Sequence, residues 1–319
     1  MKRKISFIIN PSEVAAGTRG ASLGPGAIMA VARSRSSELF SSYPKVQIKD
    51  RNDVLDKPIV HPFAKRIESL VKVYKNVSNT IQQVVESGRF PIVLAGDHGS
   101  AGGTIAGIKA IFPTERIGVI WIDAHGDLHT PYTTPSGNMH GMPLATVLNE
   151  DNRQEQRNEV PEETAHLWDK LKRIGFDGAK ILPEDLIFIG VRDLEKEEVS
   201  IMNRLNIKNF DVDYLRKQGA NQILEETLEK LENCDKIYVS FDVDSMDPEA
   251  TSHGTGTPVP KGLMVEEARI LLTGLAENPK LACLEIVEVN PCLDEKKNKM
   301  AEVTFDLLDE VIQVLTKAK

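Results

Sequence analysis

The sequence has no long hydrophobic run, which excludes the membrane-spanning classes of protein. Its apolar stretches fall well short of the roughly 20 residues that a membrane-spanning helix needs. The apolar part of the N-terminal MKRKISFIIN is also too short for a signal peptide. We therefore expect a cytoplasmic protein with no membrane partner.

Cysteine is scarce as well, with Cys234, Cys283 and Cys292 as its only occurrences. These residues are too few and too widely spaced for a disulfide framework or a zinc knuckle. We expect them to be reduced thiols in the core or in the layer next to it.

Positive charge is in deficit, since 39 Lys and Arg residues stand against 47 Asp and Glu residues, for a net charge of −8. The sequence has no basic block, and its aromatic content of 5% supplies no cluster for stacking on bases. Both features argue against nucleic acid as a partner.

What the sequence does have is a regular alternation of short apolar runs with segments of helical periodicity. This pattern predicts βαβ units and a mostly parallel sheet of the α/β class. With no clear linker or repeat, we expect a single catalytic domain over residues 1–319. The expected strands are KISFII (4–9), VQI (46–48), PIVLA (91–95), IGVIWI (117–122), LIFIG (186–190), NFDV (209–212), KIYVSFD (236–242) and CLEIVEV (283–289). The main expected helices cover 63–88, 100–111, 162–173, 220–232, 264–275 and 297–317.

Three of the expected strands run directly into clusters of acidic residues and histidines. The clusters are GDHGS (96–100), DAHGDLHT (123–130) and FDVDSMDP (241–248). Because the carboxyl ends of parallel strands meet at one edge of a sheet, we expect these side chains to converge. They supply His98, Asp123, His125, Asp127, Asp242 and Asp244.

Two imidazoles and four carboxylates predict a site for two metal ions. Six donors are too many for one ordinary zinc ion, and four carboxylates balance two divalent cations. A shared carboxylate can hold two metals close enough for one water to bridge them. The oxygen-rich donor set favours Mn²⁺, with Ni²⁺ and Co²⁺ as open alternatives.

A second FDVD sequence, at residues 210–213, competes with the one at 241–244. It follows a polar stretch and precedes YLRKQG, which has the character of a helix start. We therefore interpret Asp213 as a helix N-cap and assign the metal-binding role to the later copy. Asp97, beside His98, is either an orienting partner of that histidine or a turn residue.

Taken together, these segments resemble the arginase (ureohydrolase) family. The resemblance extends over most of the chain. It is carried by GTRGASLGPGAIMAV (17–31), AGDHGS, WIDAHGDLHTPYTTPSGNMHGMPL, FIGVRD, SFDVDSMDP, GTGTPV (254–259) and EVNP (288–291).

The resemblance implies a three-layer α/β/α fold with a central parallel sheet and two Mn²⁺ ions held by the six residues named above. In the family, a hydroxide that bridges the metals attacks the guanidinium carbon of arginine and releases urea and ornithine. Glu288 matches the acid that pairs with the guanidinium, and His140 matches the proton-transfer histidine. Thr257 is expected to line the pocket beside the guanidinium. The family also suggests a homo-oligomer, either a trimer or a hexamer.

The segment that would bind the amino-acid end of the substrate departs from the family pattern at two positions. His129 stands where arginases typically have asparagine, and Glu195 replaces an aspartate expected near the α-amino group. Glu198 matches the family pattern. So do the other expected substrate-binding residues, which are Thr134, Ser136, Asn138 and Asp193.

These departures leave the small-molecule substrate open among guanidino compounds. Arginine is the principal candidate, and guanidinobutyrate, agmatine and free guanidine are the alternatives. Two further possibilities are an amide-cleaving deacetylase with a single zinc ion and a metal-binding protein without turnover. The complete set of six donors, with His140 and Glu288, argues against both.

Overall fold

The computed structural model describes residues 2–317 and contains one sheet of eight parallel strands. The spatial order of the strands is β2-β1-β3-β8-β7-β4-β5-β6. The sheet confirms the predicted α/β class. The strands are β1 (Ile5–Asn10), β2 (Lys45–Gln47), β3 (Phe90–Ala95), β4 (Ile117–Ile122), β5 (Leu186–Ile189), β6 (Lys208–Phe210), β7 (Lys236–Asp242) and β8 (Leu281–Val287).

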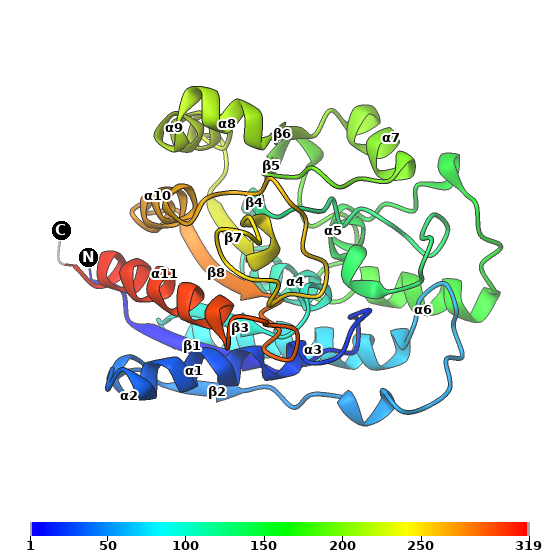
Figure 1. Ribbon diagram of the computed structural model, residues 1–319. Coiled ribbons are helices and arrows are strands. Elements are labelled where there is room, and N and C mark those ends of the chain that lie inside the picture. The colour runs from blue at the N-terminus through cyan, green and yellow to red at the C-terminus, as the bar shows by residue number, and fades with distance from the viewer. Residues whose placement is uncertain (1, 318–319) are drawn as a thin grey trace.

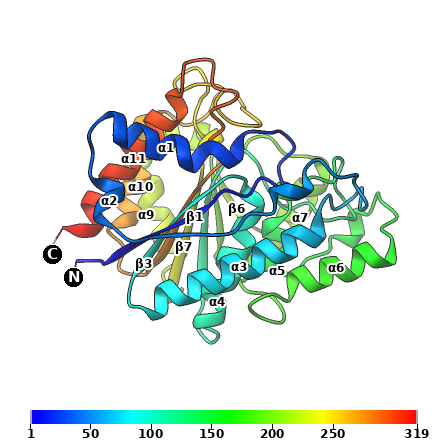
Figure 2. The same ribbon diagram turned by 90° about the horizontal axis from the view of Figure 1, so that it is seen from below.

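Helices cover both faces of the sheet and make a three-layer α/β/α arrangement (Figures 1 and 2). One face packs against α1 (Gly24–Ser34), α2 (Leu39–Ser42), α8 (Val212–Gln218), α9 (Ala220–Lys230), α10 (Val265–Ala276) and α11 (Lys299–Thr316). The core on the other face includes α3 (Ile67–Glu86), α4 (Ala101–Ile111), α5 (Pro143–Leu148), α6 (Glu162–Lys172) and α7 (Lys196–Leu205).

The central strands are apolar throughout because both of their faces are buried. In β4, Val119 and Trp121 join the core beneath α3 and α4, whereas Ile120 and Ile122 join the core beneath α10 and α11. Successive side chains of a strand point to opposite faces, so a strand buried on both sides has no polar alternation. This explains the continuous run IGVIWI.

The prediction for the FDVD sequence at residues 210–213 is wrong about where the strand ends and the helix begins. Strand β6 ends at Phe210, and α8 begins at Val212. The N-cap is therefore Asp211, whose carboxylate accepts the Tyr214 backbone N–H at 2.8 Å. Asp213 lies in the first turn of the helix, where its charge favours the helix dipole.

The cysteine prediction holds for two of the three residues. Cys234 and Cys283 are buried free thiols, whereas Cys292 is exposed. The exposed residue lies in the loop that follows β8, not in a packed element. Within residues 2–317, no helix has the length and apolar character needed to cross a membrane.

The sheet places the predicted site at its centre. Strands β3, β8, β7 and β4 are four adjacent strands of the sheet, and the polar clusters of the sequence follow β3, β4 and β7. Since all strands run in the same direction, these clusters emerge together at one edge, as expected for ligand sites of parallel α/β sheets.

Candidate active site

The six predicted donor residues come together at the carboxyl ends of β3, β4 and β7. His98 Nδ1 lies 3.0 Å from Asp123 Oδ2, 3.2 Å from Asp127 Oδ2 and 3.1 Å from Asp242 Oδ2. On the other side of the site, His125 Nδ1 lies 3.4 Å from Asp123 Oδ1 and 3.2 Å from Asp244 Oδ2. The donors thus form two groups.

Asp123 belongs to both groups and joins them. Its donor atoms gather with those of His98 and Asp127 in one group, and with those of His125 and Asp244 in the other. Its two oxygens face the two histidines separately. A carboxylate in this position can bridge two metal ions.

The site is buried, and its donor atoms fit a pair of cations. His98, Asp123, Asp242 and Asp244 are each at most 2% exposed. His98 Nδ1 and Asp123 Oδ2 are buried without a hydrogen-bond partner. Buried carboxylates and an unpartnered ring nitrogen are costly unless they bind a cation or hydrogen-bond, so the donor set fits two divalent ions.

The raised pKa values of two donor carboxylates also indicate that the cluster lacks positive charge. Burial raises the pKa of Asp242 well above its usual range, and the nearby carboxylates of Asp244 and Asp123 raise it further. Burial and the charge of Asp123 likewise raise the pKa of Asp127. Asp123 differs, because contacts with His125 and His98 outweigh its burial and hold its pKa below the usual range. Asp123 is thus the carboxylate most readily ionised.

Two contacts that the sequence did not reveal orient His98. Its Nε2 lies 2.7 Å from Ser240 Oγ, and its ring stacks on Trp121 with 4.0 Å between ring centroids. A hydrogen bond on the second ring nitrogen fixes which nitrogen faces a metal. The available signal was a lone serine in the apolar strand KIYVSFD, two residues before Asp242 and therefore on the same face.

Two residues of the site have left-handed backbones that are uncommon for residues other than glycine. Asp127 has φ 51° and Glu288 has φ 67°. Such conformations persist where surrounding contacts hold them, and they are frequent at functional sites. Glu288 is held in this way: its backbone N–H donates to the Gly96 carbonyl at 2.9 Å, and its Oε1 accepts the His98 backbone N–H at 2.8 Å.

The six donors form part of the wall of a cavity of about 290 Å³. Every predicted substrate-binding residue also lines this cavity, as does His140. These residues are His129, Thr134, Ser136, Asn138, Asp193, Glu195 and Thr257. Glu288 does not itself line the cavity, but its Oε1 lies 3.4 Å from Nδ1 of His140, which does.

The remaining predicted residues have clear structural partners. Thr257 donates to Asp244 Oδ2 at 3.1 Å, so it contacts one of the donor carboxylates directly. Asp193 is largely exposed and lies 3.8 Å from His125 Nε2. Asp97 accepts the Ala15 backbone N–H at 2.9 Å, and no hydrogen bond to the His98 ring is present. Asp97 therefore anchors the loop after β1.

A compact loop of residues 134–138 forms one side of the cavity. Thr134 Oγ1 accepts the backbone N–H groups of Ser136 and Gly137 at 3.3 and 2.9 Å. Asn138 Oδ1 accepts a hydrogen bond from Lys65 Nζ at 3.0 Å. Hydrogen bonds within the loop and one from Lys65 thus hold its conformation, and Ser136 and Asn138 line the cavity.

The two residues that depart from the family pattern contact each other. His129 Nε2 lies 3.1 Å from Glu195 Oε2 and 3.6 Å from Glu198 Oε2. The hydrogen bond with His129 lowers the pKa of Glu195 to about 2, whereas burial raises the pKa of Glu198 to about 7. Glu195 also caps α7 in a reciprocal pair with Glu198. The two residues that depart from the family pattern therefore form an ion pair with each other.

Comparison with known proteins identifies the family to which this site belongs. A sequence model described as Arginase family matches residues 3–313. The chain is a member of the arginase family. It is 33% identical to an arginase of Brevibacillus brevis, over 98% of each chain. It is 34% identical to an arginase of Bacillus caldovelox, over 96% of this chain and 97% of the other.

Solved structures of arginases share its fold. The Bacillus caldovelox arginase superposes with a TM-score of 0.80 at 34% identity, covering 98% of each chain. An Entamoeba histolytica arginase, solved in complex with L-ornithine, superposes with a TM-score of 0.83 at 27% identity. That alignment covers 98% of this arginase-family chain and 99% of the other. This member of the arginase family is therefore a hydrolase with the three-layer fold.

Proposed function

We propose that this arginase-family hydrolase cleaves L-arginine to L-ornithine and urea with two Mn²⁺ ions. The observation that carries the proposal is Asp123, whose oxygens face two separate donor groups at the wall of a cavity. The same cavity has hydrogen-bonding groups suited to an amino acid at Ser136 and Asn138. The arginase-family match and the relative that contains L-ornithine support this assignment.

The donor groups indicate which residues would hold each ion. His98, Asp127 and Asp242 would hold one ion, His125 and Asp244 would hold the other, and Asp123 would be shared. The oxygen-rich set suits Mn²⁺ better than thiol-seeking metals. When bound, such a metal pair lowers the pKa of water and so supplies a nucleophile at neutral pH.

The other residues of the site position the substrate and move protons. A guanidinium is planar and always charged, so it needs a fixed partner to present its carbon for attack. Glu288, whose Oε1 accepts the His98 backbone N–H, would pair with the guanidinium through its other oxygen. His140 would deliver a proton to the leaving amine, a task suited to a histidine near neutral pH.

At the far end of the substrate, His129 and Glu195 would separate to bind the α-carboxylate and the α-ammonium group. A protonated histidine can donate to a carboxylate, and a glutamate can accept from an ammonium. The ion pair seen between them would thus be exchanged for two contacts with the amino acid. A substrate without an α-carboxylate would leave the His129–Glu195 pair intact and the Ser136–Asn138 loop without a carboxylate to bind.

A substrate panel tests this proposal. The protein is loaded with Mn²⁺, and urea release is measured from arginine, agmatine, guanidinobutyrate and guanidine. We expect kcat/KM for arginine to exceed that for each other compound by at least about tenfold, because each lost contact costs about 1–3 kcal/mol. A preference for agmatine or guanidine would contradict the assignment of the amino-acid end. Cytoplasmic location and assembly into a trimer or hexamer stay predictions.

A further inference from the structure

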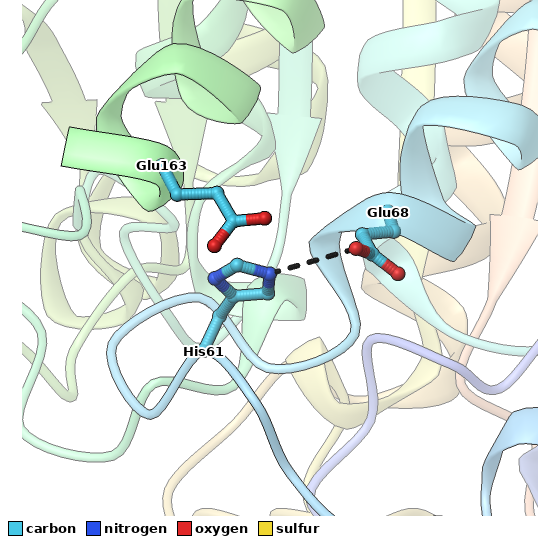
Figure 3. A group of neighbouring side chains, drawn as sticks. All are labelled: His61, Glu68 and Glu163. Carbon is cyan, nitrogen blue, oxygen red and sulfur yellow. Dashed lines mark ion pairs between the residues drawn. The ribbon is translucent and has the colours of Figure 1, made fainter. Parts of the chain in front are cut away.

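A second cluster of possible metal-binding side chains lies outside the active-site cavity. His61 is in the loop before α3, Glu68 is in the first turn of α3, and Glu163 is in the first turn of α6. One donor atom from each residue lies within 4.8 Å of the others. Figure 3 shows that the two carboxylates approach the imidazole from the two helices.

One nitrogen of the buried imidazole has no hydrogen-bond partner. His61 is 4% exposed, and its Nδ1 lies 2.9 Å from Thr164 Oγ1. Its Nε2 is buried without a partner, and the contact with Glu68 Oε1, at 3.8 Å, is too long for a hydrogen bond. If Nδ1 carries the proton and donates it to Thr164, the Nε2 lone pair is directed toward the Glu68 carboxylate (Figure 3). Metal-binding histidines are commonly oriented in this way.

The positively charged side chains nearby do not neutralise the carboxylates of this cluster. A cavity of about 280 Å³ beside His61 and Glu68 is lined by Lys57 and Arg66 as well. Lys57 pairs with Asp53 at 3.5 Å, and Arg66 donates to the Leu55 carbonyl at 3.4 Å. Both cations are therefore directed to other acceptors.

The position of the two acids in first helical turns gives a simpler reason for their presence. Negative charge there favours the helix dipole by a few tenths of a kcal/mol up to about 1 kcal/mol. That reason accounts for Glu68 and Glu163 but not for the buried Nε2 of His61. This nitrogen has no hydrogen bond, since its ion-pair contact with Glu68 is 3.8 Å long, and a buried polar atom without a hydrogen bond is rare.

We propose that His61, Glu68 and Glu163 form a Zn²⁺ site that is separate from the active site. One imidazole nitrogen and two carboxylate oxygens are donors that Zn²⁺ accepts, with water completing the coordination. The two carboxylates also balance the charge of the ion. Both acids are exposed, so the ion can reach the site from solvent.

The site would fasten the loop that supports the substrate-binding segment. The Lys65 backbone N–H donates to the Gly137 carbonyl at 2.8 Å, and its side chain donates to Asn138. Gly137 has φ 77°, and a side chain there would collide with the Pro62 carbonyl oxygen. Residues 61–65 and 136–138 are thus in close contact, so an ion at His61 would tie this contact to α3 and α6.

Metal content tests the proposal without reference to activity. Protein loaded with Mn²⁺ is titrated with Zn²⁺ at pH 7.5, desalted, and measured by plasma mass spectrometry. We compare wild type with a Glu68→Gln/Glu163→Gln variant, whose exposed substitutions keep the size of the side chains. His166→Gln is the control, because His166 is an exposed histidine on the same helix α6.

We expect wild type and the His166→Gln control to retain one more Zn²⁺ per chain than the double variant. Zinc binding to this site should be at least tenfold weaker in the double variant. A single His61→Gln variant should show the same loss, with its fold checked by circular dichroism. Equal Zn²⁺ content and affinity in wild type and the double variant would overturn the proposal, whatever the urea-forming activity.

Discussion

The side chains around the cavity divide into those that would hold the metals and those that would act only on the substrate. Asp127 belongs to the first kind, and His140 contacts Glu288 instead of a donor cluster. We predict that Asp127→Ala removes about one metal per chain and lowers kcat by about 10³-fold or more. His140→Ala should keep both metals and lower kcat by about 10²–10⁴-fold, the usual effect of losing a general acid. Metal analysis and steady-state kinetics on the same samples check both results, and unchanged kcat in both would refute the assignments.

We propose that Ser240 is a positioning residue that acts through the ring of His98. Ser240→Ala removes the 2.7 Å contact with His98 Nε2 and leaves that nitrogen buried without a partner. Loss of such an orienting contact typically weakens metal binding 10–100-fold. Mn²⁺ titration should show this weakening, whereas Ser200→Ala, on the surface helix α7, should bind as wild type does. Equal affinity in the two variants would exclude a role for Ser240.

Glu195 and His129 are the residues at which we expect a substitution to change substrate preference. A Glu195→Asp substitution shortens the acid by one methylene, which disfavours its 3.1 Å contact with His129. His129 then becomes free for the α-carboxylate, and the aspartate for the α-ammonium. We expect kcat/KM for arginine to rise about fivefold, equivalent to about 1 kcal/mol. An unchanged kcat/KM would show that position 195 does not contact the substrate.

At the scale of elements, a buried lysine in the loop after α6 makes stability depend on pH. Lys180 is 3% exposed, and its ammonium group donates to the Lys172 carbonyl in the last turn of the helix. Burial lowers the pKa of Lys180 to about 8. Between pH 8 and about 10.5 the unfolded chain therefore binds a proton that the folded chain has released.

The sign of this linkage is that the Lys180 contribution rises with pH. The free energy of unfolding should gain on the order of 3 kcal/mol from this group as pH increases from 8 to 10.5. Lys180→Met removes the titrating group. The free energy of unfolding is measured in urea over this range for both proteins. The value for wild type minus that for the variant should therefore increase with pH. A difference that is constant with pH would contradict the buried position of the ammonium.

Elements that are long or buried were predictable from the sequence, whereas boundaries and short elements were less so. All eight strands lie close to the predicted segments. The central strands were recognisable because parallel strands buried on both faces are continuous apolar runs, whereas β2 is a short, exposed edge strand. The segment NFDV shows the limit of this pattern. Its apolar Val212 begins α8 and does not continue the strand, since Asp211 offers the helix an N-cap. Local capping chemistry decided that boundary.

At the scale of the whole molecule, the sequence predicted which residues gather at one edge of the sheet but not which side chains contact each other. His98, Asp123 and Asp242 were expected to meet because the carboxyl ends of parallel strands share one edge. No comparable rule predicts which distant residue a given histidine will contact. The pairings of His129 with Glu195 and of His98 with Ser240 therefore appeared only in the structure, as did the cluster at His61.

We expect one metal pair at Asp123 to perform the hydrolysis of arginine. The most direct test is to add Mn²⁺ in steps to metal-free protein and to measure bound metal and urea release from arginine together. We predict that activity rises until two Mn²⁺ ions are bound per chain at the site and then stays constant. Full activity with a single ion, or two bound ions without urea release, would contradict this account.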